Sequence, residues 1–454
     1  MSETLFKKYN VPVPRYTSYP TANSFGPFDE TDYLKAVETS NDATADNISF
    51  YIHVPFCRHL CHYCGCNSVA MAKPDRITEY FETLHKEIDL LLPHLRKDRR
   101  ISQIHYGGGS PSSMPLHFIR SINEHLLSAF ETIDRPEIAI ECHPGYLKEE
   151  DWNYLLDSGF NRFSLGIQDF NDEVLRCVNR QPALLPVETI MKILREGGAK
   201  VNFDFIYGLP KQSVSAFVST IKKAISLRPD RLVTFSYAHL PSLFKRQMIL
   251  EKAGLPSQNE KLKMFEEASK ILQAAGYVPI GMDHFVLPDD DLSVALQHHS
   301  LHRNFQGYCP HRITAQVYAF GVSGISQLDE AYAQNTKDIS EYVSRVNAGQ
   351  LPIHRGYALV EWQRITREVI ECIMCNNSIN WRDMATRLQC SVETIKQAIH
   401  YDEQQLTTLQ GDGLIVFDDE SLHVLSEGMP FVRNVAAAFD PMMRDNHKQF
   451  STPV

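Results

Sequence analysis

Four cysteines fall within ten residues of one another, at Cys57, Cys61, Cys64 and Cys66, in the string YIHVPFCRHLCHYCGC at 51–66. The first three have the spacing C-x-x-x-C-x-x-C. Cysteines this close together in a chain without an export signal are typical of a metal site or a catalytic site rather than of disulfides. Three thiolates on one loop could bind three irons of a [4Fe–4S] cluster, which normally takes four cysteines. The spacing therefore predicts a cluster with one iron free to take an outside ligand.

A free iron suggests a particular cofactor. The amine and carboxylate of an amino acid can bind one metal together, and S-adenosylmethionine carries such an end. An electron passed into its sulfonium would release methionine and a 5′-deoxyadenosyl radical, which can take hydrogen from an unactivated carbon. The alternative is a structural zinc ion, completed by Cys66 or by one of His53, His59 and His62. Structural zinc usually takes two pairs of ligands separated by a longer loop, and the sequence has no second pair at a suitable distance. Cys66 could also be an unused neighbour of the motif or a thiol that supports the site without binding metal.

Strand and helix patterns alternate through the first half of the chain. Runs rich in β-branched and aromatic residues predict six strands, and amphipathic patterns between them predict helices. The alternation favours a parallel sheet with helical crossovers, so we expect the α/β class and a partial (β/α)6 barrel of TIM type. The predicted strands are 50–54, 102–106, 137–141, 162–166, 202–206 and 231–235, and the predicted helices include 75–91, 115–130, 184–195 and 213–227.

Candidate site residues lie at the end of every predicted strand. Because the carboxyl ends of parallel strands form the active face of such folds, we expect these residues on one rim. Loops are polar in any case, which explains one or two of these ends but not all six. The residues are Tyr51 before the cysteine loop, the run 107–110, Glu141, Gln168, Asp204 and the run 237–239.

Two of these strand ends have an ordinary structural reading as well. The run GGGSP at 107–111 is either a simple turn or a place where a ligand approaches the backbone closely, which glycine permits. Glu141 could accept a hydrogen bond from a ribose hydroxyl or an ammonium, or form a salt bridge at a strand end.

The composition narrows the class of protein. The chain has 454 residues, 43% of them hydrophobic, and a formal net charge of −10, which excludes collagen-like, low-complexity and largely disordered chains. No apolar run approaches the roughly 18 residues that a membrane helix needs, and the first ten residues lack a signal-peptide core. We therefore expect a cytoplasmic protein with no membrane partner, and the acidic balance argues against a nucleic acid partner.

The C-terminal part has a different pattern. From about Gly356 helices dominate; 380–389 and 392–400 predict a helix-turn-helix, and 414–425 predicts a hairpin like the wing of a winged helix. Residues 381–440 carry four Lys and Arg against ten Asp and Glu, which is the wrong sign for binding phosphates. We interpret this mainly helical, winged-helix-like domain as a cap.

Taken together, the motifs resemble the radical S-adenosylmethionine superfamily, and several longer strings resemble its oxygen-independent coproporphyrinogen III oxidase (coproporphyrinogen dehydrogenase) family. The likeness runs from about residue 8 to the C-terminus. The strings are KYNVPVPRYTSYPT at 8–21, GIQDFN at 166–171, VNR at 178–180, DFIYGLPKQ at 204–212, YAHLP at 237–241, GMDHF at 281–285, HRNFQGY at 302–308 and AYAQN at 331–335.

The resemblance implies oxidative decarboxylation of two propionates of coproporphyrinogen III to vinyl groups, giving protoporphyrinogen IX in haem biosynthesis. It implies a tetrapyrrole substrate, a reducing donor such as flavodoxin or ferredoxin, and a monomer. It also implies an N-terminal segment 1–45 that closes over the site, a barrel with its extension at 46–355, and a C-terminal helical domain at 356–454. Alternatives within reach of the same motifs are a radical methyltransferase, a haem-degrading enzyme, and a haem-binding or haem-delivery protein that keeps the cluster.

Carried over by matching motif, the resemblance implies a role for individual residues. Three cysteines, Cys57, Cys61 and Cys64, would hold the [4Fe–4S] cluster, and catalysis would start there rather than at a protein base. The S-adenosylmethionine bound to the cluster would contact Tyr51, Tyr63, Gly108 and Glu141. A second S-adenosylmethionine would contact Gly109, Ser110, Gln168, Arg180, Asp204, Ala238 and Ile325. Candidate cations for the substrate carboxylates are Arg15, Arg180, Arg303, Lys211 and His284, each of which could instead be structural.

The chain departs from the family pattern in two places. After the third predicted strand it reads ECHPGY, with Gly145 where familiar members have Arg, and at 309–321 it reads CPHRITAQVYAFG in place of a string rich in Thr, Asp and Leu. Both places are expected near the substrate, so they mark either a lineage variant or a changed substrate.

Overall fold

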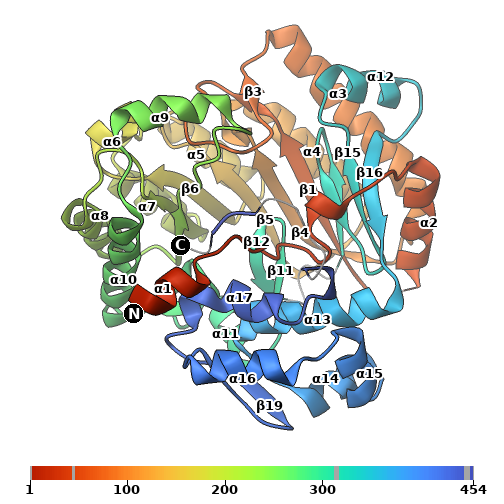
Figure 1. The fold of residues 1–454 in the computed structure, drawn as a ribbon. Helices are drawn as coiled ribbons and strands as arrows, with labels where there is room; N and C mark the ends of the chain where they lie inside the picture. The colour runs from red at the N-terminus through yellow and green to blue at the C-terminus, as the bar shows by residue number, and fades with distance from the viewer. Residues whose placement is uncertain (1–2, 43–45, 311–315, 444–449, 453–454) are drawn as a thin grey trace.

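The computed structural model describes residues 3–42, 46–310, 316–443 and 450–452. Its centre is a row of six neighbouring parallel strands, and all six predicted strands are confirmed within it. The strands are β1 (Asn47–Val54), β4 (Arg100–Gly108), β5 (Thr132–Cys142), β6 (Arg162–Gln168), β7 (Lys200–Tyr207) and β8 (Arg231–Ser236). Figure 1 shows them curving around the interior of the molecule, as expected for a partial (β/α)6 barrel.

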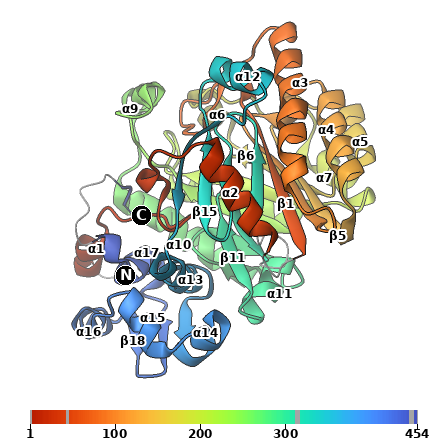
Figure 2. The ribbon, with the colours of Figure 1, turned by 90° about the vertical axis from the view of Figure 1, so that its right-hand side faces the viewer.

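Helices cross between successive strands and cover the outer face of the barrel, where α3, α4, α5 and α7 lie together in Figure 2. Their apolar sides pack on the sheet around fully buried residues such as Trp152. The predicted helices are confirmed to within a few residues. The crossover helices are α3 (Pro74–Leu91), α4 (Leu116–Ala129), α5 (Glu149–Asp157), α6 (Asp172–Cys177), α7 (Val187–Glu196) and α8 (Val214–Leu227), with α9 (Met248–Ala253) and α10 (Gln258–Ala274) following β8.

The sheet continues beyond the six strands at both ends, which gives twelve strands in the order β16-β15-β14-β13-β1-β4-β5-β6-β7-β8-β10-β9. At one end, β13 (Val317–Phe320) pairs parallel with β1 and leads into the antiparallel strands β14 (Ile325–Gln327), β15 (Ala331–Asn335) and β16 (Ile353–Ala358). At the other end, β10 (His284–Val286) and β9 (Val278–Ile280) are antiparallel. Smaller elements of this part are β2 (Phe56–Cys57), β3 (Val69–Ala70), α11 (Asp291–Gln297), β11 (Leu301–Asn304), β12 (Gly307–Pro310) and α12 (Ile339–Asn347).

The C-terminal part is mainly helical and packs against one end of the barrel (Figure 1). The expected helix-turn-helix is present as α14 (Trp381–Leu388) and α15 (Val392–Ala398), and the expected hairpin as β18 (Ile415–Phe417) and β19 (Ser421–Val424). The remaining elements are α13 (Glu361–Asn376), β17 (Ser378–Asn380), α16 (Glu403–Gly411) and α17 (Val432–Ala437). Because β16 runs through the expected boundary at 355/356, we propose that the second domain starts at α13.

The N-terminal segment belongs to both parts. Tyr16 and Tyr19 are buried in the same core as the helices of the C-terminal part, together with residues of α1 (Glu3–Tyr9). Further along, Phe25 stacks on Tyr332 of β15, and α2 (Glu30–Asn41) lies against the extended sheet. The segment therefore bridges the barrel and the C-terminal part.

Candidate functional site

The cysteine loop leaves the carboxyl end of β1 and is fixed at several points. β2 and β3 pair through Cys57 and Ala70, and the main chain of His62 donates to the carbonyl of Val178 at 3.0 Å. The ring of His53 in β1 makes a hydrogen bond with the carbonyl of Asn67 at 3.0 Å. The three thiols of the motif are therefore presented together at the rim of the sheet, with Cys61 buried.

The side chain of Arg180, which follows α6, lies against the cysteine loop. It is buried, and its Nη1 donates to the Sγ of Cys61 at 3.6 Å and to the hydroxyl of Tyr63 at 3.2 Å. Its Nη2 also donates to the carbonyl of Gly166. A buried guanidinium needs a compensating negative charge, which the thiolate ligands of a bound cluster would supply.

Cys66 lies next to Cys64 rather than apart from it. The main-chain N–H of Cys66 donates to the Sγ of Cys64 at 3.4 Å. Hydrogen bonding from the Cys66 side chain lowers the pKa of the Cys64 thiol to about 6, and it raises the pKa of Cys66 itself. This arrangement favours Cys66 as a thiol that supports its neighbour.

The glycines at the end of β4 make room for neighbouring protein atoms. A Cβ on Gly107 would lie 2.7 Å from the Oε1 of Glu141, and one on Gly109 would lie 2.6 Å from the carbonyl oxygen of Pro55. Gly108 has φ +111°, and its Cβ would lie 2.5 Å from the ring of His53. The glycines thus allow β4 to approach β1 and the start of the cysteine loop, which is a packing role that the sequence did not separate from cofactor contact.

A cavity of about 170 Å³ lies between this loop and the strand ends. Gln168, which has φ +67°, turns its side chain into this region, and its Oε1 is buried without a hydrogen-bond partner, as is the Nε2 of His143. Orphaned buried polar atoms are costly, so they indicate a bound group that would complete them. On the same rim, burial raises the pKa of Asp204 to about 6, although Ser164 donates to its carboxylate at 2.7 Å.

Most of the residues expected from the sequence line this one cavity. Tyr51 lies just beneath it, where its hydroxyl would be 3.0 Å from a Cβ on Gly107. Ala238 lines a neighbouring cavity, and Ile325 lies in β14 against the pair Phe25 and Tyr332, outside both cavities. The expected residues that line the cavity are Cys57, Cys61, Cys64, Tyr63, Gly108, Gly109, Ser110, Glu141, Gln168, Arg180 and Asp204.

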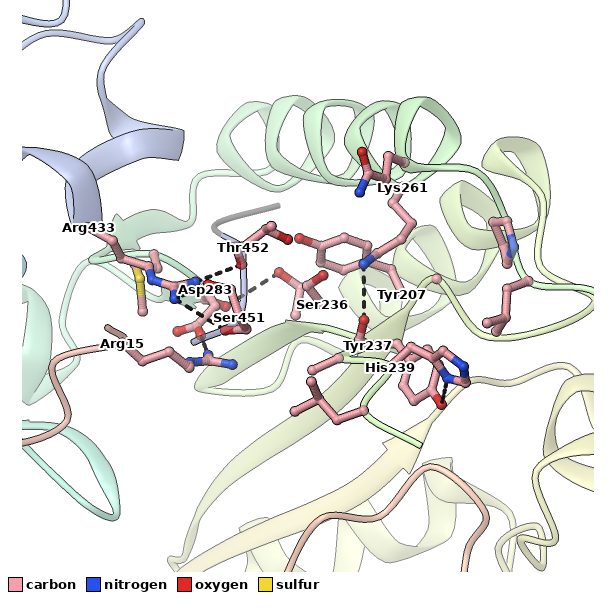
Figure 3. Close-up of a pocket in the computed structure, with 18 of the residues that line it drawn as sticks. Arg15, Tyr207, Ser236, Tyr237, His239, Lys261, Asp283, Arg433, Ser451 and Thr452 are labelled. Carbon is pink, nitrogen blue, oxygen red and sulfur yellow. Dashed lines mark hydrogen bonds and ion pairs between the residues drawn. The ribbon is translucent and has the colours of Figure 1, made fainter. Parts of the chain in front are cut away.

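The neighbouring cavity, of about 380 Å³, opens beyond the ends of β7 and β8 (Figure 3). Arg15 and Arg433 lie at one end of it and Lys261 at the other. The carboxylate of Asp283 accepts from Arg15 at 3.3 Å and pairs with His284 at 2.7 Å. Burial alone would raise the pKa of Asp283, but His284 and the charge of Arg15 lower it to about 2.

Two cations of this second cavity were not expected from the sequence. Burial lowers the pKa of Lys261 to about 8, and its Nζ donates to the carbonyl of Tyr237 at 3.0 Å. Burial and the charges of Arg15 and Arg303 lower the pKa of Arg433 to about 9. Both residues come from helices whose sequence pattern predicts only packing, so nothing local distinguishes them from surface cations.

Arg433 also joins the two ends of the described chain. Its guanidinium donates to main-chain carbonyls of Pro14 at 3.0 Å, Ser451 at 2.8 Å and Thr452 at 2.8 Å, and to the carbonyl of Val13. Carbonyls do not neutralise the charge, so the cavity is rich in positive charge at this end.

The other expected cations are dispersed. Arg303 is buried and donates to the hydroxyl of Tyr308 at 3.0 Å, close enough to Arg433 and Asp283 to affect their pKa. Lys211 is exposed after β7 and lines neither cavity. The structure therefore places Arg15 in the lining of the second cavity, whereas His284 lies outside that lining and reaches it only through its bond to Asp283.

The two departures from the family pattern can be located in part. A Cβ on Gly145 would lie 2.6 Å from the carbonyl oxygen of Pro182, so the backbone there leaves no room for a larger residue. Residues 311–315 of the string at 309–321 lie outside the described residues, whereas 317–320 form the buried strand β13.

No three His, Cys, Asp or Glu side chains within the described ranges are arranged to hold a single metal ion. Across the same ranges, none of the helices has the length and apolar character needed to cross a bilayer. The fit to a cluster rests on the donor set, three thiols on one loop facing the cavity with a buried cation against one of them.

Residues 51–224 match the model of the radical SAM superfamily, which defines the class of the barrel and its cysteine loop. The chain is 37% identical over 458 residues to an oxygen-independent coproporphyrinogen III oxidase from Pseudomonas aeruginosa, covering 98% of this chain and 97% of that one. It is also 37% identical to the Escherichia coli protein of the same name, with the same coverage. The solved structure of coproporphyrinogen III oxidase from Escherichia coli superimposes with a TM-score of 0.89, at 36% identity over 97% of this chain and 99% of that one. The chain belongs to the oxygen-independent coproporphyrinogen III oxidase family.

Proposed function

We propose that this chain carries out the oxidative decarboxylation of two propionates of coproporphyrinogen III, giving protoporphyrinogen IX. Each propionate loses one hydrogen atom, carbon dioxide and one electron, and a vinyl group remains. The observation that carries the proposal is the juxtaposition of two cavities at one strand rim: one with three thiols, and one lined by cations that suit a carboxylate-rich substrate.

The first cavity suits the family's cofactors. Cys57, Cys61 and Cys64 would hold the [4Fe–4S] cluster, and because they are three ligands for four irons, one iron would be left for S-adenosylmethionine. When bound, this pair supplies a carbon radical that removes hydrogen from an unactivated carbon. Glu141 presents a half-exposed carboxylate that can accept from an ammonium or a ribose hydroxyl. Arg180 balances the charge of the thiolate at Cys61.

Around this cavity the chain's own residues would orient the cofactor. Tyr63 lines it, Tyr51 lies beneath it next to Gly107, and Gly108 lets the strand lie close to β1. The unpartnered Oε1 of Gln168 offers an acceptor, and the raised pKa of Asp204 keeps part of its carboxyl protonated near neutral pH. A second S-adenosylmethionine could use the rim from Gly109, Ser110, Gln168, Arg180 and Asp204 towards Ala238, and Ile325 of β14 is a further contact that the resemblance implies.

The second cavity would take the tetrapyrrole. Arg15, Arg433 and Lys261 can each donate to a propionate carboxylate, and charge-assisted bonds of this kind are the strong ones. Arg303 adds positive potential from behind. The segment that carries Arg15 would close over the substrate, as the resemblance implies. We also propose a cytoplasmic monomer that takes electrons from a flavodoxin or ferredoxin and binds neither nucleic acid nor membrane.

The decisive experiment is anaerobic incubation of the reconstituted chain with coproporphyrinogen III, S-adenosylmethionine and dithionite, with products measured by mass spectrometry. We expect one vinyl group, one carbon dioxide and one 5′-deoxyadenosine for each propionate lost. A methylated tetrapyrrole would favour a methyltransferase, ring-opened haem would favour a degrading enzyme, and tight haem binding without turnover would favour a delivery protein. Each of these three results would refute the proposal.

A further inference from the structure

Large apolar side chains are exposed on the loop and helix that follow β8. Leu243, Met248 and Ile249 are 68%, 53% and 49% exposed. Isolated exposed apolar residues are ordinary, whereas a group of them marks a contact surface. In both ribbon views α9, which begins at Met248, stands on the outside of the barrel near α6 (Figures 1 and 2). The group is therefore a candidate docking surface.

This loop is fastened directly to the cysteine loop. The buried side chain of Gln247 donates through Nε2 to the carbonyl of Tyr63 at 3.0 Å and to that of Ala238 at 3.3 Å. The ring of Phe244 packs over Gly65, where a Cβ would lie 3.2 Å from it. A partner seated on Leu243 would consequently rest beside the loop that carries the three motif cysteines.

The charge of this region is opposite to that of the chain as a whole. The chain has 55 Asp and Glu and a net charge of −10, yet the segments 51–74, 174–187 and 231–250 contain none. These segments contact one another, since His62 bonds to the main chain of Val178 and Gln247 to that of Tyr63.

The basic side chains here include Lys245, which is exposed, and Arg246, which is half-buried beside it. The nearest carboxylate along the chain, Glu251, is paired with His239 at 2.9 Å. The surface beside the cysteines is therefore apolar with a basic rim.

We propose that a donor patch, made of Leu243, Lys245, Arg246, Met248 and Ile249, docks a small acidic protein that carries single electrons. The inference rests on the proposed function, in which each cleavage of S-adenosylmethionine consumes one electron from outside the chain. One electron leaves the reduced flavin or iron–sulfur centre of the carrier, which is oxidised by one electron, and is taken up at the site of Cys57, Cys61 and Cys64. No atom moves in this step.

The donor patch fits such a carrier better than other occupants. Electron transfer slows steeply with distance, so the carrier must dock next to the cysteines while the substrate cavity stays open. Complementary charge guides a protein with an acidic face to the basic rim. In a two-fold contact between copies of this chain the same basic patch would meet itself, which brings charges of one sign together, and such juxtaposition is unfavourable.

The test compares two ways of supplying electrons. We would measure 5′-deoxyadenosine formed anaerobically with either a reduced, acidic flavodoxin or dithionite, which is small and needs no docking surface. The variants are Leu243→Asp and Lys245→Glu. Matched controls away from the donor patch are Val416→Asp on β18, where the side chain is 45% exposed, and Lys97→Glu before β4.

We expect each patch variant to raise the KM for flavodoxin about tenfold, since rim charges and anchoring contacts act mainly on association. Its dithionite rate should stay within about twofold of the wild-type rate, and both controls should behave as wild type. Isothermal titration calorimetry with oxidised flavodoxin should show the Kd rising by the same factor as the KM.

Several results would overturn the inference. They are an equal loss of rate with both reductants, an unchanged KM and Kd for flavodoxin, or a wild-type dimer in sedimentation that Leu243→Asp separates. If the wild-type chain forms no 5′-deoxyadenosine even with dithionite, the proposed function itself fails and the donor patch fails with it. If the rate with dithionite is normal and the rate with flavodoxin is the same in the variants as in the wild type, the donor patch alone is refuted.

Discussion

Replacing Gly108 by alanine should damage the cysteine loop without touching a cysteine. Gly108 has φ +111°, a region that costs an L-residue roughly 1–2 kcal/mol. The new Cβ would lie 2.5 Å from Cε1 and 2.7 Å from Nε2 of His53, and overpacking of this kind costs about 1–3 kcal/mol. Moving the ring would also break its 3.0 Å bond to the carbonyl of Asn67, worth about 1 kcal/mol. The total is about 4 kcal/mol.

Gly198→Ala is the matched control, because Gly198 has φ +73° and no atom within 4 Å of its Cβ position. It carries the backbone strain alone, about 1–2 kcal/mol. We would measure thermal unfolding of the metal-free protein and the iron bound per chain after reconstitution. Gly108→Ala should lower Tm by at least twice the shift of the control and bind less iron. Equal Tm shifts with full iron in both variants would refute the argument that His53 holds the loop.

Three further predictions test other parts of the structure. Burial raises the pKa of Glu87 from 4.5 to about 7, so this carboxyl binds a proton more tightly in the folded chain than in the unfolded chain. The free energy of unfolding therefore falls by about 3 kcal/mol as the pH rises from 4.5 to 7. The difference in unfolding free energy between wild type and Glu87→Gln should change by that amount from pH 4.5 to 7.5, and a constant difference would contradict it. Cys61→Ala should abolish the brown colour and iron binding while Cys66→Ala keeps both, as measured by absorbance and iron content; the reverse order would assign the ligands differently. Arg433→Met should raise the KM for coproporphyrinogen III about 10- to 100-fold, which is the value of a charge-assisted hydrogen bond. Cleavage of S-adenosylmethionine without substrate should stay unchanged. An equal loss of rate in both assays would make Arg433 purely structural.

The barrel could be predicted from the sequence because its signals are local. Each strand, such as 202–206 within β7, is a short run rich in β-branched and aromatic residues between helical patterns, and the parallel order of six neighbouring strands follows from the crossovers. The antiparallel additions at both ends of the sheet were missed. Strands such as β9 and β14 are only three residues long, and they become strands through pairing with distant segments.

The part of the candidate site that lies at the strand ends could be predicted for the same reason. The cysteine loop and the rim from Gly108 to Asp204 come together because each residue ends a predicted strand. Arg433 and Lys261 could not be found in this way, since tertiary packing alone brings their helices to the second cavity. Ile325 is assigned to the site by resemblance alone, and because it lies in β14 against Phe25 and Tyr332 its contact with a cofactor stays a prediction.

The bonds from Arg433 to Val13, Pro14, Ser451 and Thr452 tie two segments far apart in the sequence to one end of the second cavity. Because Ser451 and Thr452 themselves line this cavity, a fluorescent label attached at either residue would report on substrate entry.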